Sequence, residues 1–313
     1  MLFATPSNPV PEGAICGRLT AADGVALRFA RWEVAEPTRG TVCVLPGRGE
    51  KIEKYFETVE NLRSRGFCVA ALDWRGQGAS GRLLRDPVKG HVGSFDDYQL
   101  DLEVFMREVV VPHCPAPHFA LAHSMGAAIL LDNARLGGAW FERQFLIAPM
   151  LQIALIRQPR IARATARCLS ALWLDRFGVP ARRGAYAADP PFDGNRLSSD
   201  PVRYARNVGI SRAHPELDVG VPTVGWIRAA FDLMDRLADP AAARAIRQPL
   251  LIVGAGADRV VSTRAIEHFG ARLIAGAHIV IPGARHELLQ ERDLYREQLL
   301  AAFDAFIPGS RAA

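Results

Sequence analysis

Three residues of types that could perform acyl transfer stand at separate points of this 313-residue sequence, each after a short apolar run. Ser124 follows Phe119 to Ala122, and Asp258 and His286 follow later apolar runs. A serine hydroxyl becomes a good nucleophile only when a base removes its proton, and the base needs an acid to orient and stabilise it. If the fold brings them together, Ser124, His286 and Asp258 predict a nucleophile, a base and an acid.

The residues around Ser124 are typical of a strand, a sharp turn and a helix. A helix-like pattern begins directly after the serine, and Gly126 supplies a small neighbour. In the motif Gly-x-Ser-x-Gly, such a turn holds the serine in a strained conformation, and here Ala122 takes the place of the first glycine. Alone the motif is degenerate, and a serine that caps an ordinary helix is the alternative.

Acyl transfer also needs N–H donors for the oxyanion of the tetrahedral intermediate. A glycine-rich turn, Pro46 to Gly49, follows the β-branched run Thr41 to Leu45 and should expose backbone N–H groups. The N–H of Met125, directly after the nucleophile, and the N–H of Arg48 in this turn are the expected pair.

Other histidines and aspartates have less suitable positions for a base or an acid. Seven further histidines lack the position after the last strand and are expected to be structural or exposed: His91, His113, His118, His123, His214, His268 and His278. Of these, His123 precedes the nucleophile and should point away from it. Three further acids follow a helical pattern that is typical of a solvated face: Asp232, Asp235 and Asp239.

Alternating strand and helix patterns predict a parallel sheet that could position these groups. Val25 to Trp32 and Thr41 to Leu45 are expected to be neighbouring strands. Ile52 to Ser64 then has helical spacing and Phe67 to Leu72 is a buried strand, which completes a crossover unit. Later elements are a helix over Ser94 to Val111 and strands at Gln144 to Ile147, Pro249 to Val253 and His278 to Ile281. Functional groups collect beyond the carboxyl ends of such strands.

The alternation breaks in the middle of the chain. Residues 150–222 contain arginine-rich helical patterns and then proline-rich sequence, so we expect an inserted cap or lid. Residues 1–149 and 223–313 would then form the first and second parts of one α/β core, with a mostly parallel central sheet and helices on both faces.

From Thr41 to Phe303 the sequence resembles the α/β-hydrolases grouped around lysophospholipases, monoacylglycerol lipases and serine aminopeptidase-like hydrolases. The matching motifs are Gly47–Glu50, Asp73–Ser80, Gly90–Tyr98, His123–Gly126, Gly256–Val261 and Gly283–Glu287. This resemblance implies an α/β-hydrolase fold and the same nucleophile, base and acid, with no metal and no organic cofactor. The chain departs from the family pattern at Pro46, where members often have histidine, and at Ala122, where they have glycine.

The basic residues of the predicted lid form a distinct cluster. Seven arginines and one acid, Asp175, lie between Arg157 and Arg183, so this segment outweighs the formal charge of +5 of the whole chain. Three of the arginines share one helical face, and Ile161, Leu169, Leu172 and Trp173 fall toward another. Such a helix could rest on an anionic lipid surface or meet a phosphate-bearing substrate. The alternative is a soluble lid whose arginines are solvated and whose apolar face covers the core.

Composition favours an ordinary globular protein, with 49% hydrophobic and 23% charged residues and no indication of nucleic-acid binding. Five scattered cysteines (Cys16, Cys43, Cys68, Cys114 and Cys168) lack metal-ligand spacing and are expected to be reduced core residues. Without a signal-like segment or an apolar run of 18 residues, we expect a cytoplasmic protein, with membrane contact limited to the inner surface through the lid.

These observations predict a serine hydrolase that cleaves carboxylic esters through an acyl-enzyme, with a single-chain lipid as the substrate. A short-chain carboxylesterase and an amide-cleaving hydrolase share the same chemistry and stay open. A hydrolase-shaped binding protein is the alternative from another class, because a fold alone never establishes activity.

Overall fold

A central sheet of eight strands organises the part of the chain that the computed structural model describes, residues 1–35, 38–180 and 190–308. The spatial order is β1-β2-β4-β3-β5-β6-β7-β8. The pairs β1–β2 and β2–β4 are antiparallel, and every later pair is parallel. The strands are β1 (Ala14–Thr20), β2 (Ala26–Trp32), β3 (Thr41–Leu45), β4 (Cys68–Asp73), β5 (His118–His123), β6 (Arg143–Ile147), β7 (Leu250–Ala255) and β8 (Gly276–Ile281).

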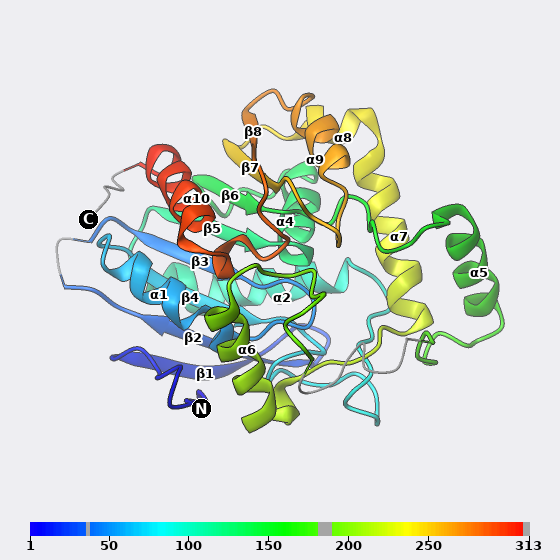
Figure 1. Cartoon of the computed structure of the whole chain (residues 1–313), viewed down its shortest axis with the longest axis horizontal. Coiled ribbons are helices and arrows are strands. Elements are labelled where there is room, and N and C mark those ends of the chain that lie inside the picture. Colours follow the sequence, from blue (N-terminus) through cyan, green and yellow to red (C-terminus); the bar gives the residue numbers. More distant parts are fainter. Residues whose placement is uncertain (36–37, 181–189, 309–313) are drawn as a thin grey trace.

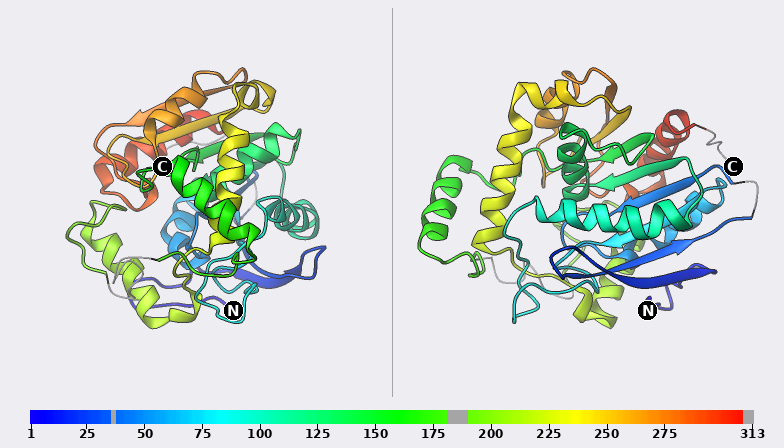
Figure 2. Two further views of the ribbon diagram at one scale, coloured as in Figure 1. Left: turned by 90° about the vertical axis from the view of Figure 1, so that its right-hand side faces the viewer. Right: turned by 180° about the vertical axis from the view of Figure 1, so that it is seen from behind.

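Helices cover both faces of this sheet (Figures 1 and 2). The α-helices are α1 (Phe56–Arg63), α2 (Asp97–Phe105), α3 (Val111–His113), α4 (Met125–Arg135), α5 (Pro159–Ala171), α6 (Pro201–Ala213), α7 (Val224–Ala238), α8 (Pro240–Ala245), α9 (Thr263–Gly270) and α10 (Asp293–Phe306). The short helices are η1 (Ile52–Tyr55), η2 (Met106–Val110), η3 (Pro215–Leu217) and η4 (Leu288–Gln290). α1 and α10 lie on one face, and α2 and α4 lie on the other. The expected α/β-hydrolase architecture is confirmed.

The middle strands are hydrophobic on both faces because helices cover both sides of the sheet. All five residues of β3 and all six of β4 and β7 are buried. Such continuous apolar runs are typical of parallel strands. They also explain why these strands could be recognised from the sequence.

The first strands differ from the sequence-based expectation in two ways: one strand was not predicted, and the predicted order of two others is wrong. β1 was not anticipated, because it is an edge strand with only one buried residue, Leu19, and its sequence has weak alternation. The strands β2 and β3 are not neighbours, since β4 lies between them. The crossover from β3 through α1 places β4 beside β3, so β2 pairs with the far edge of β4.

The cysteines are all free, but only three lie in the core. Cys43, Cys68 and Cys114 are buried, Cys16 is partly exposed and Cys168 is exposed. The expectation of a core position is therefore wrong for Cys168. This residue lies on α5, a helix in which Ala166 is the buried residue and Cys168 faces solvent.

The segment between β6 and α7 contributes α5 and α6 (Figure 1). α5 packs on α7 at one end of the molecule, and α6 lies near α1 (Figures 1 and 2). Within the described ranges, no helix has the length and apolar character that crossing a membrane would need.

Candidate active site

Ser124 lies at a sharp turn between the end of β5 and the start of α4. Its backbone has φ 50° and ψ −109°, a conformation that L-residues rarely adopt. A Cβ atom on Gly126 would lie 2.5 Å from the carbonyl oxygens of both Leu45 and Pro46. α4 therefore starts in backbone contact with the end of β3, and only glycine fits at this position.

The structure brings the three predicted side chains into one hydrogen-bonded chain. His286 Nε2 lies 3.1 Å from Ser124 Oγ, and His286 Nδ1 lies 2.7 Å from Asp258 Oδ2. The His286 side chain is 5% exposed and the Asp258 side chain is fully buried. The three groups come from the ends of β5, β7 and β8, so the sheet itself sets their separation.

The Asp258 carboxylate is held by more than the histidine. Its Oδ1 atom accepts hydrogen bonds from the backbone N–H groups of Val260 (2.7 Å) and Val261 (3.0 Å). Burial alone would raise the pKa of Asp258, but the hydrogen bond from His286 and these N–H groups hold it below the usual value. Asp258 therefore stays ionised and keeps Nδ1 of His286 in the protonated tautomer.

The glycine-rich turn after β3 is fixed by two side chains. Glu50 accepts a hydrogen bond from the N–H of Gly47, and Gln77 Oε1 accepts one from the N–H of Gly49 at 3.1 Å. Gln77 also donates to the Gly47 carbonyl at 2.7 Å. The Pro46 carbonyl accepts from the indole N–H of Trp74 at 2.8 Å, which braces the position where the chain departs from the family pattern.

A buried cluster of charged residues lies beside His286 and consists of Glu50, Lys54, His123 and Glu287. Lys54 Nζ is 2.6 Å from both Glu50 Oε1 and Glu287 Oε1. Glu50 Oε1 also lies 3.0 Å from His123 Nδ1. No local pattern in the sequence indicates this cluster, because its members come from three separate segments, although Glu50, His123 and Glu287 each lie inside a recognised motif.

His123 connects this cluster to the backbone of His286. His123 Nε2 lies 3.1 Å from the His286 carbonyl oxygen, and the two rings are 4.8 Å apart. Burial alone would lower the pKa of His123, but the Glu50 carboxylate raises it above the usual value. Burial likewise would raise the pKa of Glu50, yet His123 and Lys54 hold it well below its usual range. The ring of His123 can therefore donate at both nitrogens, to Glu50 and to His286.

Comparison with known proteins gives the family. A family model described as serine aminopeptidase, S33 matches residues 36–293. The chain belongs to this family. It is 34% identical to lysophospholipase L2 of Escherichia coli (strain K12) over 294 residues, which cover 92% of this chain and 85% of that protein.

Two further comparisons find lipases that are similar in sequence or in fold. Monoacylglycerol lipase of Mycolicibacterium smegmatis is 26% identical over 276 residues, covering 86% of this chain and 88% of that protein. Among solved structures, a soluble variant of monoglyceride lipase from Saccharomyces cerevisiae superposes with a TM-score of 0.73 at 19% identity, and 97% of each chain is covered. The last comparison supports the fold, and the chain is a hydrolase of the α/β-hydrolase class.

The other candidates from the sequence lie outside the hydrogen-bonded chain of Ser124, His286 and Asp258. The three helical acids do not approach the catalytic groups: Asp232 and Asp235 pair with Arg167 and Arg163, and Asp239 caps α8. Among the other histidines, His91 Nδ1 contacts the hydroxyl of Thr223 at 2.8 Å. Across residues 1–35, 38–180 and 190–308, no group of three or more metal-ligating side chains occurs.

The apolar face of α5 does not cover the core, so the expectation of a simple soluble lid fails in this respect. Ile161 is 60% exposed, and beyond the helix end Leu172 and Trp173 are 67% and 92% exposed. Instead, α5 packs on α7 with ion pairs from Arg163 and Arg167. Arg182 and Arg183 of the predicted basic cluster lie outside the described residues.

Proposed function

We propose that this protein is a serine hydrolase that cleaves carboxylic esters of single-chain lipids, as a lysophospholipase or monoacylglycerol lipase. Ser124 is the nucleophile, His286 the general base and then the general acid, and Asp258 the orienting acid. The observation that carries this proposal is the continuous hydrogen-bond chain from Ser124 through His286 to Asp258.

In the proposed mechanism, Ser124 Oγ attacks the ester carbonyl while His286 Nε2 takes its proton. The backbone N–H groups of Arg48 and Met125 stabilise the oxyanion. His286 then protonates the leaving alcohol, which departs and leaves an acyl-enzyme. A water molecule then attacks this ester while His286 takes its proton, and His286 passes that proton to Ser124 Oγ as the fatty acid is released.

The substrate class is supported by the names of the relatives. The relatives that align over more than four-fifths of this chain include a lysophospholipase and a monoacylglycerol lipase. Both names describe enzymes that act on glycerolipids with one acyl chain. The ester and the single chain are therefore the features we assign to the substrate, and the head group stays open.

We also propose that residues 150–222 form a lid and that α5 with the following turn touches the inner membrane surface. Trp173, Leu172 and Phe177 are exposed, and Arg157, Arg160 and Arg176 are exposed nearby. Apolar side chains beside arginines suit the boundary between anionic head groups and acyl chains. This arrangement would bring the active site next to its lipid substrate.

The experiment that tests the function is a substrate panel of lysophospholipids, monoacylglycerols and short soluble esters, measured with the wild type and with Ser124→Ala. We expect kcat/KM to be higher for dodecanoyl than for acetyl esters, and Ser124→Ala to remove activity on both. Equal activity on both chain lengths would favour a short-chain carboxylesterase. Hydrolysis of amides alone would favour the amide-cleaving alternative, and no turnover of any compound would favour a binding protein.

A further inference from the structure

A cavity bordered by the described residues lies away from Ser124, Asp258 and His286. It has a volume of about 690 Å³ and lies between α5, α7 and α9. Neither Ser124, Asp258 nor His286 lines it. A cavity of this size is within the range that holds small-molecule ligands.

A short pair of segments separates this cavity from the active site. Ile153 and Val261 form an antiparallel bridge, and the N–H of Ser262 donates to the Gln152 carbonyl at 2.9 Å. Gln152 and Ser262 line the cavity, whereas the N–H groups of Val260 and Val261 bond to Asp258. The wall of the cavity is therefore the outer side of the loop that holds the catalytic acid.

The floor of the cavity is apolar. Phe231 and Met234 of α7 and Phe269 of α9 line it, and each is less than 7% exposed as a residue. Leu237 of α7 and Leu151 extend the same surface. This floor suits an alkyl chain.

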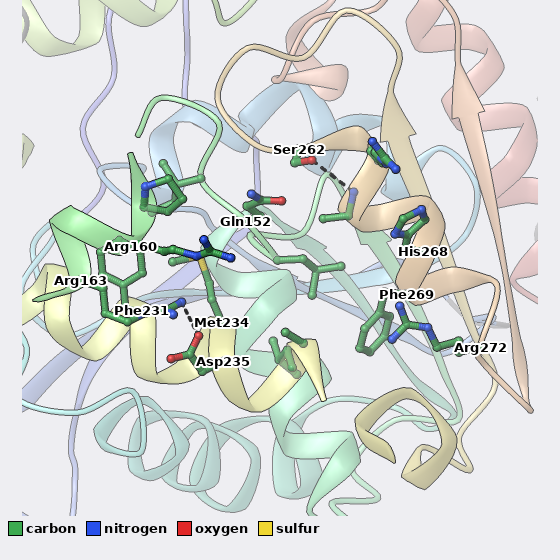
Figure 3. Close-up of a pocket in the computed structure, with 17 residues that line it drawn as sticks. Gln152, Arg160, Arg163, Phe231, Met234, Asp235, Ser262, His268, Phe269 and Arg272 are labelled. Atoms are coloured by element: carbon green, nitrogen blue, oxygen red, sulfur yellow. Dashed lines mark hydrogen bonds and ion pairs between the residues drawn. The ribbon is translucent and has the colours of Figure 1, made fainter. Parts of the chain in front are cut away.

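The rim of the cavity is strongly basic. Figure 3 shows Arg160 and Arg163 at one end and His268 and Arg272 at the other. Arg264 also lines the cavity, since it lies four residues before His268 on the same face of α9, and Arg272 follows the end of this helix. The lining thus combines four arginines with one carboxylate, Asp235.

Within the part of the chain that the structure describes, three of these four arginines have no acidic partner. Asp235 pairs with Arg163 and lies 3.7 Å from Arg167. Among the described residues, Arg160, Arg264 and Arg272 form no ion pair with a carboxylate. Arg163 Nε is buried and has no hydrogen-bond acceptor among the same residues. Guanidinium groups bind carboxylates and phosphates with paired hydrogen bonds, so the rim is suited to an anion.

We propose that this cavity is a second ligand site, which binds a single-chain amphiphile with an anionic head group, a carboxylate or a phosphate. The arginines of α5 and α9 hold the head group, and the floor of Phe231, Met234 and Phe269 holds the start of the alkyl chain. This site is separate from the catalytic centre and does not require turnover.

The test uses Ser124→Ala protein, which cannot consume a lipid by the proposed mechanism, and three photoreactive probes with the same dodecyl chain. The probes carry a carboxylate, a phosphate or a trimethylammonium head group. We expect the anionic probes to label peptides of α7 and α9 and the cationic probe not to label them. The stronger anionic probe identifies the preferred head group. Labelling confined to other peptides, or equal labelling by the cationic probe, would overturn the proposal.

Charge reversal supplies an independent measurement by titration calorimetry with dodecyl phosphate and dodecanoate. Arg264→Glu with Arg272→Glu should weaken binding roughly tenfold, because two cations of the rim become anions. Arg264→Gln with Arg272→Gln should give a smaller loss. The matched control is Arg18→Glu with Arg244→Glu, at exposed positions on β1 and α8, and it should bind like the parent protein. Unchanged binding in the variants at Arg264 and Arg272, with the same unfolding temperature as the parent protein, would contradict the proposed site.

Discussion

The conformation of Ser124 depends on two small residues with different roles. Gly126 allows α4 to touch the backbone at the end of β3, where a methyl group would overlap two carbonyl oxygens. Ala122 is buried in β5 between Leu45 of β3 and Leu146 of β6. The structure thus accommodates alanine at position 122, where the family motif has glycine. At position 126 it leaves no space for a methyl group.

These two positions give a matched pair of substitutions. Gly126→Ala should lower the free energy of unfolding by about 1–3 kcal/mol, because the new methyl group must push α4 away from Pro46. It should also lower kcat, since Ser124 moves with the helix. Ala122→Gly should keep kcat within about twofold and cost about 1 kcal/mol. Thermal unfolding measures the stability of each variant, and ester hydrolysis measures its kcat. Equal effects of Gly126→Ala and Ala122→Gly would contradict the different roles of the two positions.

The role proposed for Asp258 can be tested without changing its shape. Asp258→Asn should lower kcat by about three to four orders of magnitude, because an amide favours the wrong tautomer of His286. The KM should change little, since Asp258 does not touch the substrate. Steady-state kinetics of the folded variant measure this effect, and near-normal kcat would exclude Asp258 as the orienting acid.

Among the elements, α6 is attached to α1 through the carboxylate of Glu57, and Arg203 of α6 also pairs with Asp293 of α10. Glu57 of α1 contacts Arg203 at 2.7 Å and Arg206 at 2.6 Å, both on α6, and lies 3.8 Å from Arg296 of α10. Burial alone would raise the pKa of Glu57, but these arginines lower it from 4.5 to about 2. Glu57 therefore binds part of the proposed lid to the core.

Because the pKa of Glu57 is lower in the folded than in the unfolded chain, its stabilisation is complete above pH 4.5 and is lost as the pH falls toward about 2. Glu57→Gln should lower the free energy of unfolding by about 1–2 kcal/mol at neutral pH, after allowance for solvent screening. The free energy of unfolding of the variant should also depend less on pH between about 2 and 4.5. Glu60→Gln, on the exposed side of α1, is the control. Denaturant unfolding at several pH values measures this effect. Equal stability of Glu57→Gln and Glu60→Gln at every pH would contradict the role of Glu57.

The exposed apolar residues after α5 bear on membrane contact. Leu172→Ser with Trp173→Ser should reduce activity on lipid presented in anionic vesicles several-fold, because less apolar surface enters the membrane. Activity on a soluble acetyl ester should not change. Leu294→Ser is a suitable control, because Leu294 on α10 is 67% exposed, as Leu172 is. An equal loss on both substrates, or an equal loss in the control, would argue against membrane contact by α5.

For the whole molecule, local motifs could be predicted and long-range assembly could not. Ser124, Asp258 and His286 could be predicted because each follows a strand with a recognisable apolar run, and parallel strands bring their carboxyl ends to one edge. The position of β4 between β2 and β3 depends on pairing across the sheet. The contact between Glu50, Lys54, His123 and Glu287 depends on three segments meeting in the core. No local pattern predicts such contacts.

The most direct test of the account is labelling with a fluorophosphonate that carries a dodecyl chain, followed by mass spectrometry of the peptides. We predict one adduct, on Ser124, which forms faster than with a methyl fluorophosphonate and is slowed strongly by His286→Ala. An adduct on another residue, or no adduct in folded protein that hydrolyses dodecanoyl esters, would contradict the assignment of Ser124 as the nucleophile.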